Sequence, residues 1–163
     1  MMRTVALTQG KVALVDDADY ATVAGFRWFA MRQPNGRWYA LRNAPKGQTK
    51  LMHRLIIAFP GKDTDHENHN GLDNRRGNLR PASRAQNNAN SRKQEGTTSR
   101  FKGVSWHRQR ARWRAYICVD WKQEHLGLFD FEEDAARAYD EAARKYFGEF
   151  ALTNFSTDGK INQ

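Results

Sequence analysis

The sequence predicts an α+β protein: an N-terminal β-rich segment with a strand–loop–strand–helix unit, followed by a three-stranded antiparallel sheet packed on one helix. Apolar and polar residues alternate over 4–15, 26–42 and 112–119, as in half-buried strands. Small apolar residues recur at helical spacing over 135–146. Segment 88–99 carries almost no apolar residue, so it is the natural join between two domains.

These observations divide the chain into regions. A first domain covers 1–90, with a β-rich part over 1–50 and the strand–loop–strand–helix unit over 50–92. A linker over 91–99 leads to a second domain over 100–156, and 157–163 form a tail. Within the first fifty residues, Gly10-Lys11 and Asn35-Gly36 predict hairpin turns, and Asp16, Asp17 and Asp19 begin a short helix between the hairpins. The aromatic residues of this part are expected to pack its core: Trp28, Phe29, Trp38 and Tyr39.

The order of elements over 63–92 follows from turn and cap residues. The segment 67–77 is rich in Gly, Asn and Asp and predicts a loop. Asn78-Leu79-Arg80 predicts a short strand after it, and Pro81 cannot lie inside a helix. Ser83 followed by Gln86 is a capping-box pattern, so a helix is expected to start at Arg84, with Asn87 in its first turns.

Four polar residues of this unit suit phosphodiester hydrolysis. The imidazole of His66 could act as a general base, because its ordinary pKa lies near neutrality. The Asp65 carboxylate and an amide oxygen such as that of Asn87 are ligands that Mg²⁺ accepts. His66 and His69 could instead form a zinc pair, but structural zinc sites usually need thiolates and the chain has only Cys118.

The motifs Asp65-His66, Leu72-Asp73-Asn74-Arg75 and Asn78-Leu79-Arg80 resemble the HNH endonuclease family, in the form found in phage and intron-encoded homing endonucleases. The resemblance covers roughly residues 50–92, and that family calls the unit a ββα-metal motif. It implies that His66 is the general base and that Asn78 orients it. It further implies that Asp65 and Asn87 bind one divalent metal, Mg²⁺ or Mn²⁺. His53 and Arg54 become candidates for phosphate contact.

The charge of the chain is unevenly distributed along its length. The net charge is +9, and residues 91–119 hold eight Lys and Arg against one acidic residue. Residues 120–163 hold five basic and ten acidic residues, so a cationic middle is followed by an acidic end. This pattern favours a polyanionic partner and predicts nucleic acid. No apolar run has the length of a membrane span and no signal peptide is recognisable, so a cytoplasmic protein is expected.

The second domain predicts a sheet with two unlike faces. Alternation over 112–119 places Trp113, Ala115, Ile117 and Val119 on a core face and the intervening residues on a cationic face. The helix expected to cover the core face carries one apolar stripe: Ala135, Ala138, Tyr139, Ala142, Ala143 and Tyr146. Acidic residues lie in its first turn, and Arg144 and Lys145 lie in its last turn before Gly148.

Several segments resemble the Apetala-two or ethylene-response-factor DNA-binding domain, known best from plants and also found fused to HNH nucleases in phages and bacteria. These segments are Lys102-Gly103-Val104, Leu126-Gly127-Leu128-Phe129-Asp130, 135–140 and Leu152-Thr153-Asn154-Phe155. The resemblance implies that the sheet enters the DNA major groove. It nominates eight DNA-binding residues: Lys102, Trp106, Arg108, Arg110, Arg112, Arg114, Tyr116 and His125. Ser105 and Cys118 depart from arginines of many plant members, so base preference does not transfer.

Together these features predict a DNA endonuclease of homing type in a bacterial host cell, of phage or prophage origin. Its second domain would dock on double-stranded DNA, and its first would cut with the His66 base and one metal ion. A non-catalytic phage or prophage DNA-binding regulator is the alternative. An RNA-processing nuclease is a third possibility. The sequence leaves open whether the protein is a monomer or a homodimer, and whether the product is a nick or a double-strand break.

Overall fold

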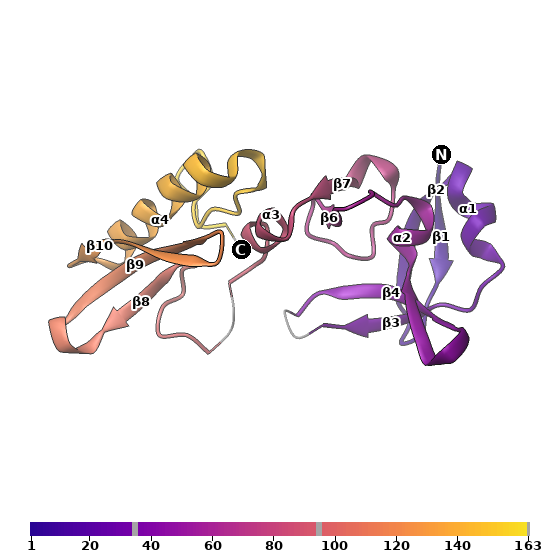
Figure 1. Cartoon of the computed structure of the whole chain (residues 1–163), viewed down its shortest axis with the longest axis horizontal. Helices are drawn as coiled ribbons and strands as arrows, with labels where there is room; N and C mark the ends of the chain where they lie inside the picture. Colours follow the sequence, from indigo (N-terminus) through magenta and orange to yellow (C-terminus); the bar gives the residue numbers. More distant parts are fainter. Residues whose placement is uncertain (34–35, 94–95, 163) are drawn as a thin grey trace. The chain divides into compact units, whose positions relative to one another are not determined.

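A computed structural model describes residues 1–33, 36–93 and 96–162, and the chain divides into two compact units, Met1–Arg84 and Ala85–Gln163. Helices and antiparallel sheets occur in both units, which confirms the α+β prediction (Figure 1). The division between units falls near the start of helix α3 (Arg84–Ala89), before the predicted boundary at residue 90. None of the helices among the described residues is long and apolar enough to span a bilayer.

Unit 1 begins with the hairpin and helix that the alternation predicts. Strand β1 (Met2–Ala6) pairs antiparallel with β2 (Val12–Asp16), and helix α1 (Asp17–Ala24) follows at once. The turn passes through Gly10 at φ 64°, a conformation that favours glycine. A second sheet has the order β3-β4-β5, formed by β3 (Phe29–Arg32), β4 (Trp38–Ala44) and β5 (Gln48–Leu51). The 3₁₀ turn η1 (Pro45–Gly47) joins β4 to β5, and the predicted turn residue Asn35 lies outside the described residues.

The strand–loop–strand–helix order predicted after residue 50 is also present. Helix α2 (Met52–Ile56) precedes strand β6 (Asp63–His66), and the loop ends in the 3₁₀ turn η2 (Arg76–Asn78). Strand β7 (Leu79–Ala82) then pairs antiparallel with β6, with Asp65 opposite Arg80 and His66 opposite Leu79. Pro81 is tolerated in β7 because this sheet has only two strands and leaves one edge of β7 unpaired. Helix α3 begins at Arg84, as the capping pattern predicts.

The core of unit 1 gathers residues from both hairpins, α1, α2 and β7. It contains Val5, Ala13, Val15, Val23, Trp28, Ala40, Met52, Ile56 and Leu79. Trp28 is buried, and its indole Nε1 donates to the Val23 carbonyl at 2.9 Å, so the prediction that this ring packs the core is confirmed.

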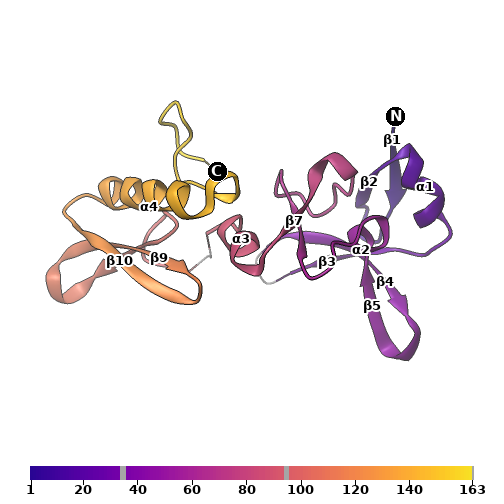
Figure 2. The same ribbon diagram turned by 45° about the horizontal axis from the view of Figure 1, so that its top comes forward.

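Unit 2 is built on a three-stranded antiparallel sheet of order β10-β9-β8. Strand β8 (Val104–His107) is followed by the 3₁₀ turn η3 (Arg108–Arg110), β9 (Arg112–Val119) and β10 (Lys122–Phe129). Helix α4 (Glu132–Phe147) lies along one face of this sheet and ends before the short turn η4 (Gly148–Phe150) (Figures 1 and 2). The predicted sheet packed on one helix is therefore confirmed.

The packing of α4 on the sheet follows the predicted apolar faces. Ala115 and Ile117 from β9 are buried against the helix residues Ala135, Ala136 and Tyr139. Tyr146, which the helical pattern assigned to the core, is 40% exposed, and its hydroxyl donates to Glu124 Oε2 at 2.8 Å. In the last turn of α4 it is Phe147 that packs against the core, so the neighbouring Tyr146 points to the side and contacts Glu124 of β10.

Gly103 is required by the same packing. It has φ 73°, and a Cβ atom at this position would lie 1.9 Å from Cδ2 of Tyr139. Only a residue without a side chain lets the chain before β8 approach the Tyr139 ring this closely. Because the ring belongs to α4, Gly103 sets the spacing between helix and sheet.

A polar network joins the ends of unit 2. The buried Asp140 carboxylate accepts from the backbone N–H groups of Asn154 and Phe155, at 2.7 and 2.8 Å, and from the Asn154 side chain at 3.0 Å. Asn154 also accepts from the Lys102 N–H at 2.7 Å and donates to the Lys102 carbonyl at 3.0 Å. The Lys102 ammonium in turn donates to the carbonyls of Ala89 and Ser91, so the end of α3 is held on this unit.

Replacing Gly103 with Ala should destabilise unit 2 by at least about 2 kcal/mol, because the substitution adds both a steric clash and an unfavourable backbone conformation. Urea unfolding followed by circular dichroism measures this change. Gly77→Ala is the control, since a Cβ there meets nothing within 4 Å and its φ is not positive. Equal midpoints for the two variants would show that Gly103 does not set the helix–sheet spacing.

Candidate functional site

The residue predicted as a general base, His66, lies in a buried cluster of rings in unit 1. This histidine cluster consists of Tyr39, His53 and His66. The His53 and His66 rings meet edge to face with centroids 5.0 Å apart, and both side chains are buried, at 5% and 3% exposure. The predicted phosphate contact His53 therefore lies inside the fold, and its neighbour Arg54 donates to Asp63 at 3.3 Å on the surface.

Burial sets the protonation of both histidines. The pKa of His53 is lowered to about 3, mainly by burial and in addition by the charges of His66 and Arg54. Burial also lowers the pKa of His66, against the opposing effects of a hydrogen bond to Asn74 and the charge of Asp65. Both rings are therefore neutral at pH 7.

One side chain that contacts His66 is Asn74, to which the sequence assigned no role. Asn74 is fully buried, and its Oδ1 lies 3.3 Å from His66 Nε2. Asn78, predicted to orient the histidine, uses its side chain elsewhere: Oδ1 accepts from the Asn68 N–H at 2.9 Å and Nδ2 donates to the Asp73 carbonyl at 2.7 Å. The Asn78 amide thus spans the loop between β6 and β7, and a role of Asn78 in orienting His66 through its side chain or backbone stays a prediction.

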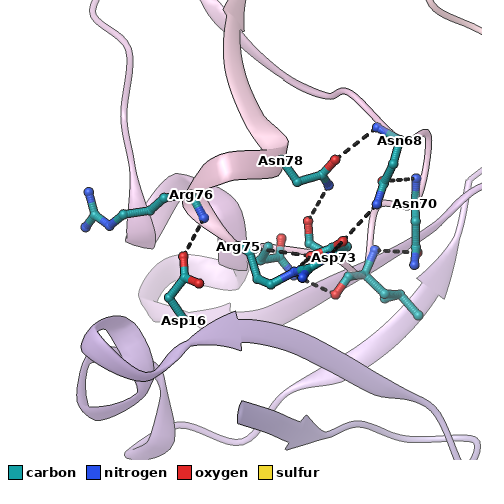
Figure 3. Close-up of polar contacts among 9 residues, drawn as sticks. Asp16, Asn68, Asn70, Asp73, Arg75, Arg76 and Asn78 are labelled. Carbon is teal, nitrogen blue, oxygen red and sulfur yellow. Dashed lines mark hydrogen bonds and ion pairs between the residues drawn. The ribbon is translucent and has the colours of Figure 1, made fainter. Parts of the chain in front are cut away.

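That loop is held together by polar side chains centred on Asp73 (Figure 3). The buried Asp73 carboxylate accepts from Asn68 Nδ2 at 2.8 Å and from two nitrogens of Arg75, at 2.7 and 2.6 Å. These hydrogen bonds from Arg75 hold the pKa of Asp73 below its ordinary value. Asn68 and Asn70 each accept a backbone N–H two residues further on, which closes two tight turns.

Arg76 fastens the same loop to the N-terminal hairpin and helix. Its backbone N–H donates to Asp16 Oδ2 at 2.8 Å (Figure 3). Its guanidinium binds both carboxylate oxygens of the buried Asp19, each at 2.8 Å, and donates to the Ile56 carbonyl at 3.1 Å. The Asp and Arg residues of segment 73–76 therefore have structural partners, and they position the loop beside the histidine cluster.

The predicted metal ligands Asp65 and Asn87 lie in different units of the chain. Asp65 is buried, and its Oδ2 accepts from Arg80 Nε at 3.0 Å, so a cationic side chain already neutralises this carboxylate. Asn87, the other predicted ligand, belongs to unit 2. Among the described residues no group of three or more His, Cys, Asp or Glu side chains could hold a metal ion. His69 Nδ1 lies 3.3 Å from Arg37 Nη2. A bound Mg²⁺ or Mn²⁺ stays a prediction.

The second candidate site is the face of the β8–β9–β10 sheet turned away from α4, here called the open face. A hollow of about 370 Å³ lies on it, lined by His107, Arg110, Arg114, Tyr116, Gln123, His125 and Leu128. The period of two produces this surface, since Arg114 and Tyr116 alternate in β9 with the buried Ala115 and Ile117. The lining offers cationic donors, ring nitrogens, an amide and a hydroxyl in one place.

The structure divides the predicted DNA-binding residues into two groups. Arg110, Arg114, Tyr116 and His125 line the hollow, whereas His107, Gln123 and Leu128 line it without having been predicted. The cross-strand register could have indicated these three, since they belong to the same alternating pattern. Arg112 is exposed beside the hollow and pairs with Asp130 at 2.9 Å, and Arg108 is exposed in η3.

Two of the predicted residues do not lie on the open face. Trp106 is opposite Trp113 in the β8–β9 register, and their rings meet edge to face with centroids 5.0 Å apart on the side that α4 covers. The Lys102 ammonium binds the Ala89 and Ser91 carbonyls, as described above. A resemblance between sequences can predict the position of a lysine. It does not predict which carbonyl groups the lysine side chain contacts in this fold.

Comparison with known proteins identifies the second unit. The model of the AP2 domain family matches residues 99–149. The AP2-like ethylene-responsive transcription factor ANT of Arabidopsis thaliana is 41% identical over 71 residues, which cover 37% of this chain and 13% of the relative. APETALA2-like protein 2 of Oryza sativa subsp. japonica is 44% identical over 59 residues, covering 36% and 14%. The transcription factor PLT2 of Arabidopsis thaliana is 48% identical over 59 residues, covering 35% and 10%.

Residues 99–149 are similar to the AP2 domain. The match confirms the predicted relationship of the second domain, and the chain aligns with only a small part of each of these plant relatives. The prediction of a metal-dependent endonuclease is contradicted, because the named relatives are transcription factors and not nucleases. The comparisons support neither a fused HNH nuclease nor a bacterial or phage origin.

The stability of unit 1 should depend on pH through the histidine cluster. The pKa of His53 is about 3 in the folded chain and near 6.5 when unfolded, so the unfolded state binds more protons between these values. The free energy of unfolding should therefore be constant above pH 7 and fall below pH 6.5, by up to about 1.4 kcal/mol per pH unit for each histidine.

Urea titrations between pH 4.5 and 8, followed by tryptophan fluorescence, measure this slope. His53→Phe keeps a ring at the same position and removes one titrating group, so its slope should be smaller than that of the wild type. If the variant kept the full slope, the pH dependence would have to arise outside the His53 ring.

Replacing Lys102 with Met should reduce the stability of unit 2 rather than its attraction to DNA. The substitution keeps the apolar stem but leaves the Ala89 and Ser91 carbonyls without their cationic donor, at a cost of about 1–3 kcal/mol. Thermal unfolding and the salt dependence of DNA binding distinguish the two roles. Lys122→Met, at an exposed position of β10, is the control for the loss of one positive charge. A Lys102→Met variant with normal stability and a smaller salt slope would contradict this assignment.

Proposed function

We propose that this protein is a sequence-specific DNA-binding protein that regulates transcription, and that it binds double-stranded DNA through the open face of the β8–β9–β10 sheet. The observation that carries the proposal is the hollow on this face, with its two arginines and its hydrogen-bonding side chains, inside the segment that matches the AP2 domain. The plant relatives are named as transcription factors, and this favours regulation of transcription as the role of the DNA-bound protein.

The shape and polarity of the open face fit the major groove of DNA. That groove is about 12 Å wide and accepts strands, and each base pair presents a distinct pattern of donors and acceptors there. The polar residues of the hollow come from all three strands or the turn between β8 and β9, so they form one continuous surface. The narrow major groove of A-form RNA would not admit such a sheet, and this argues for DNA over structured RNA.

The exposed arginines of the β8–β9 turn are suited to the phosphate backbone. Arg108 and Arg110 occupy η3 at the end of the sheet, where a strand placed in a groove would meet the groove wall. Contacts of this kind supply affinity without sequence information, and they release counterions from the DNA. Arg112 would contribute less, because Asp130 already neutralises it.

Binding of the full chain to duplex DNA should weaken steeply with salt, and Arg110→Ala should reduce the logarithmic salt slope by about one. Fluorescence anisotropy with a labelled duplex between 50 and 300 mM KCl provides the measurement. Lys122→Met serves as the control for a cation in the same unit outside the hollow. The proposal would be overturned if the wild type bound duplex DNA no better than an equally charged single strand, or if Arg110→Ala left the slope unchanged.

The regulatory part of the proposal has its own test. A reporter gene placed downstream of the duplex sequence that the protein selects should change its expression when the chain is produced. Scrambling the selected site, with the same protein level, should abolish the change. If the protein bound the selected DNA tightly and expression of the reporter did not change, the regulatory part of the proposal would be rejected and only DNA binding would stand.

A further inference from the structure

The cationic side chains of unit 1 are concentrated on one of its sheets. Between Tyr20 and Lys62 the sequence contains no Asp or Glu but eight Lys and Arg residues. This stretch includes β3, β4 and β5, and the hairpin of β4 and β5 projects from the rest of unit 1 (Figure 2). Residues 42–50, here called the basic hairpin, contain Arg42, Lys46 and Lys50, and all residues from 45 to 50 are exposed.

The carboxylates of unit 1 are bound to other cations. Each accepts a hydrogen bond or an ion pair from an arginine outside the basic hairpin: Arg3, Arg54, Arg75, Arg76 or Arg80. Among the described residues of this unit, no ion pair joins a carboxylate to Arg42, Lys46 or Lys50. The positive charge of the basic hairpin is therefore available to an anion from outside the chain.

The composition of the basic hairpin favours a polyanion as its partner. Arg42 and Lys50 lie directly opposite each other in the β4–β5 register. Like charges at such positions destabilise a sheet, and an anion bound beside them would remove this repulsion. Residues 46–50 include no apolar side chain, so the end of the hairpin does not offer the anchors of a hydrophobic protein interface. Gln48 and Thr49 add an amide and a hydroxyl that can donate hydrogen bonds to an anion.

Two cations of the same sheet face are held on aromatic rings. Arg42 Cζ lies 4.1 Å from the centre of the Phe26 ring, and Phe26 meets the buried Trp28 edge to face with centroids 6.2 Å apart. Lys11 Nζ lies 4.3 Å from the centre of the Trp38 ring. Trp38 and Arg42 are four residues apart in β4, so they share a face and lie about 13 Å apart along the strand. This row of cations is long enough to span several phosphates of a DNA strand.

We infer that the basic hairpin of unit 1 is a second DNA-binding surface, which binds the phosphate backbone without reading the base sequence. This inference rests on the proposed function, because its partner is the duplex that unit 2 binds. Phosphates are repeated along every duplex, so contacts to them add affinity without sequence preference. Since both units belong to one chain, DNA binding by unit 2 raises the local concentration of phosphate at unit 1, and two weak contacts act together.

The full-length chain carrying both Lys46→Gln and Lys50→Gln tests this inference. Arg42 is kept, because it also packs on Phe26. The double variant should bind a labelled duplex about tenfold more weakly in anisotropy titrations, and its logarithmic salt slope should be smaller by about two, since each phosphate contact contributes about 0.9. The ratio of its affinities for the selected and the scrambled duplex should equal that of the wild type.

A matched control removes the same charge elsewhere. Lys62→Gln combined with Lys122→Gln changes two exposed lysines that lie outside both the basic hairpin and the hollow, and it should keep the wild-type slope. Hydroxyl-radical footprinting then locates the contact on the DNA. The wild type should protect backbone positions beyond those that the hairpin variant protects, while both protect the selected site. Circular dichroism checks that each variant is folded.

The outcomes separate this inference from the proposed function. If the wild type bound duplex DNA no better than an equally charged single strand, both would fail. If Arg110→Ala weakened binding while the hairpin variant matched its control in affinity, salt slope and footprint, only the inference would fail.

Discussion

The close approach of helix α4 to the sheet is the interaction on which the rest of unit 2 depends. Alanines on α4 and the missing side chain of Gly103 allow the helix to cover Ala115 and Ile117 completely. One face of the sheet thereby packs against the helix in the core of this unit. The opposite face does not pack against the helix, so it can carry arginines, a tyrosine and histidines. Side chains alternate between the two faces of a strand, so β9 contributes to the core with one face and to the candidate functional surface with the other.

The features predicted correctly from the sequence are those with a regular period. Alternation in β9 assigned its two faces, and the alanine spacing of α4 assigned its buried stripe, except for Tyr146 at the end of the helix. The hydrogen-bond partners of individual polar side chains could not be predicted from a periodic pattern of this kind. Lys102 was predicted to bind DNA, yet its ammonium binds carbonyls at residues 89 and 91, which become its neighbours only after the chain has folded back.

The loop of unit 1 shows why motif spacing alone led to a wrong function. Asp73, Asn74, Arg75 and Asn78 form a pattern expected of a catalytic loop, and in the fold most of them hold one another. Asn74 and Asn78 carry the same amide, so spacing could not show which one meets His66 and which one closes the loop. Residue types that suit hydrolysis also suit buried polar networks, so motif spacing alone did not distinguish between these two roles.

Acidic residues of unit 2 would orient the proposed encounter with DNA. In the first turn of α4, Glu132 accepts from Ser99 and from the Arg100 N–H, and Glu124 accepts from Tyr146 at the other end. These carboxylates belong to the helix side of the unit, where they stabilise the fold and repel phosphate. The open face has Asp130, paired with Arg112, as its acidic neighbour, while Arg108 and Arg110 project from its edge. Under the proposed function, this distribution of charge would attract DNA to the open face and repel it from the helix side.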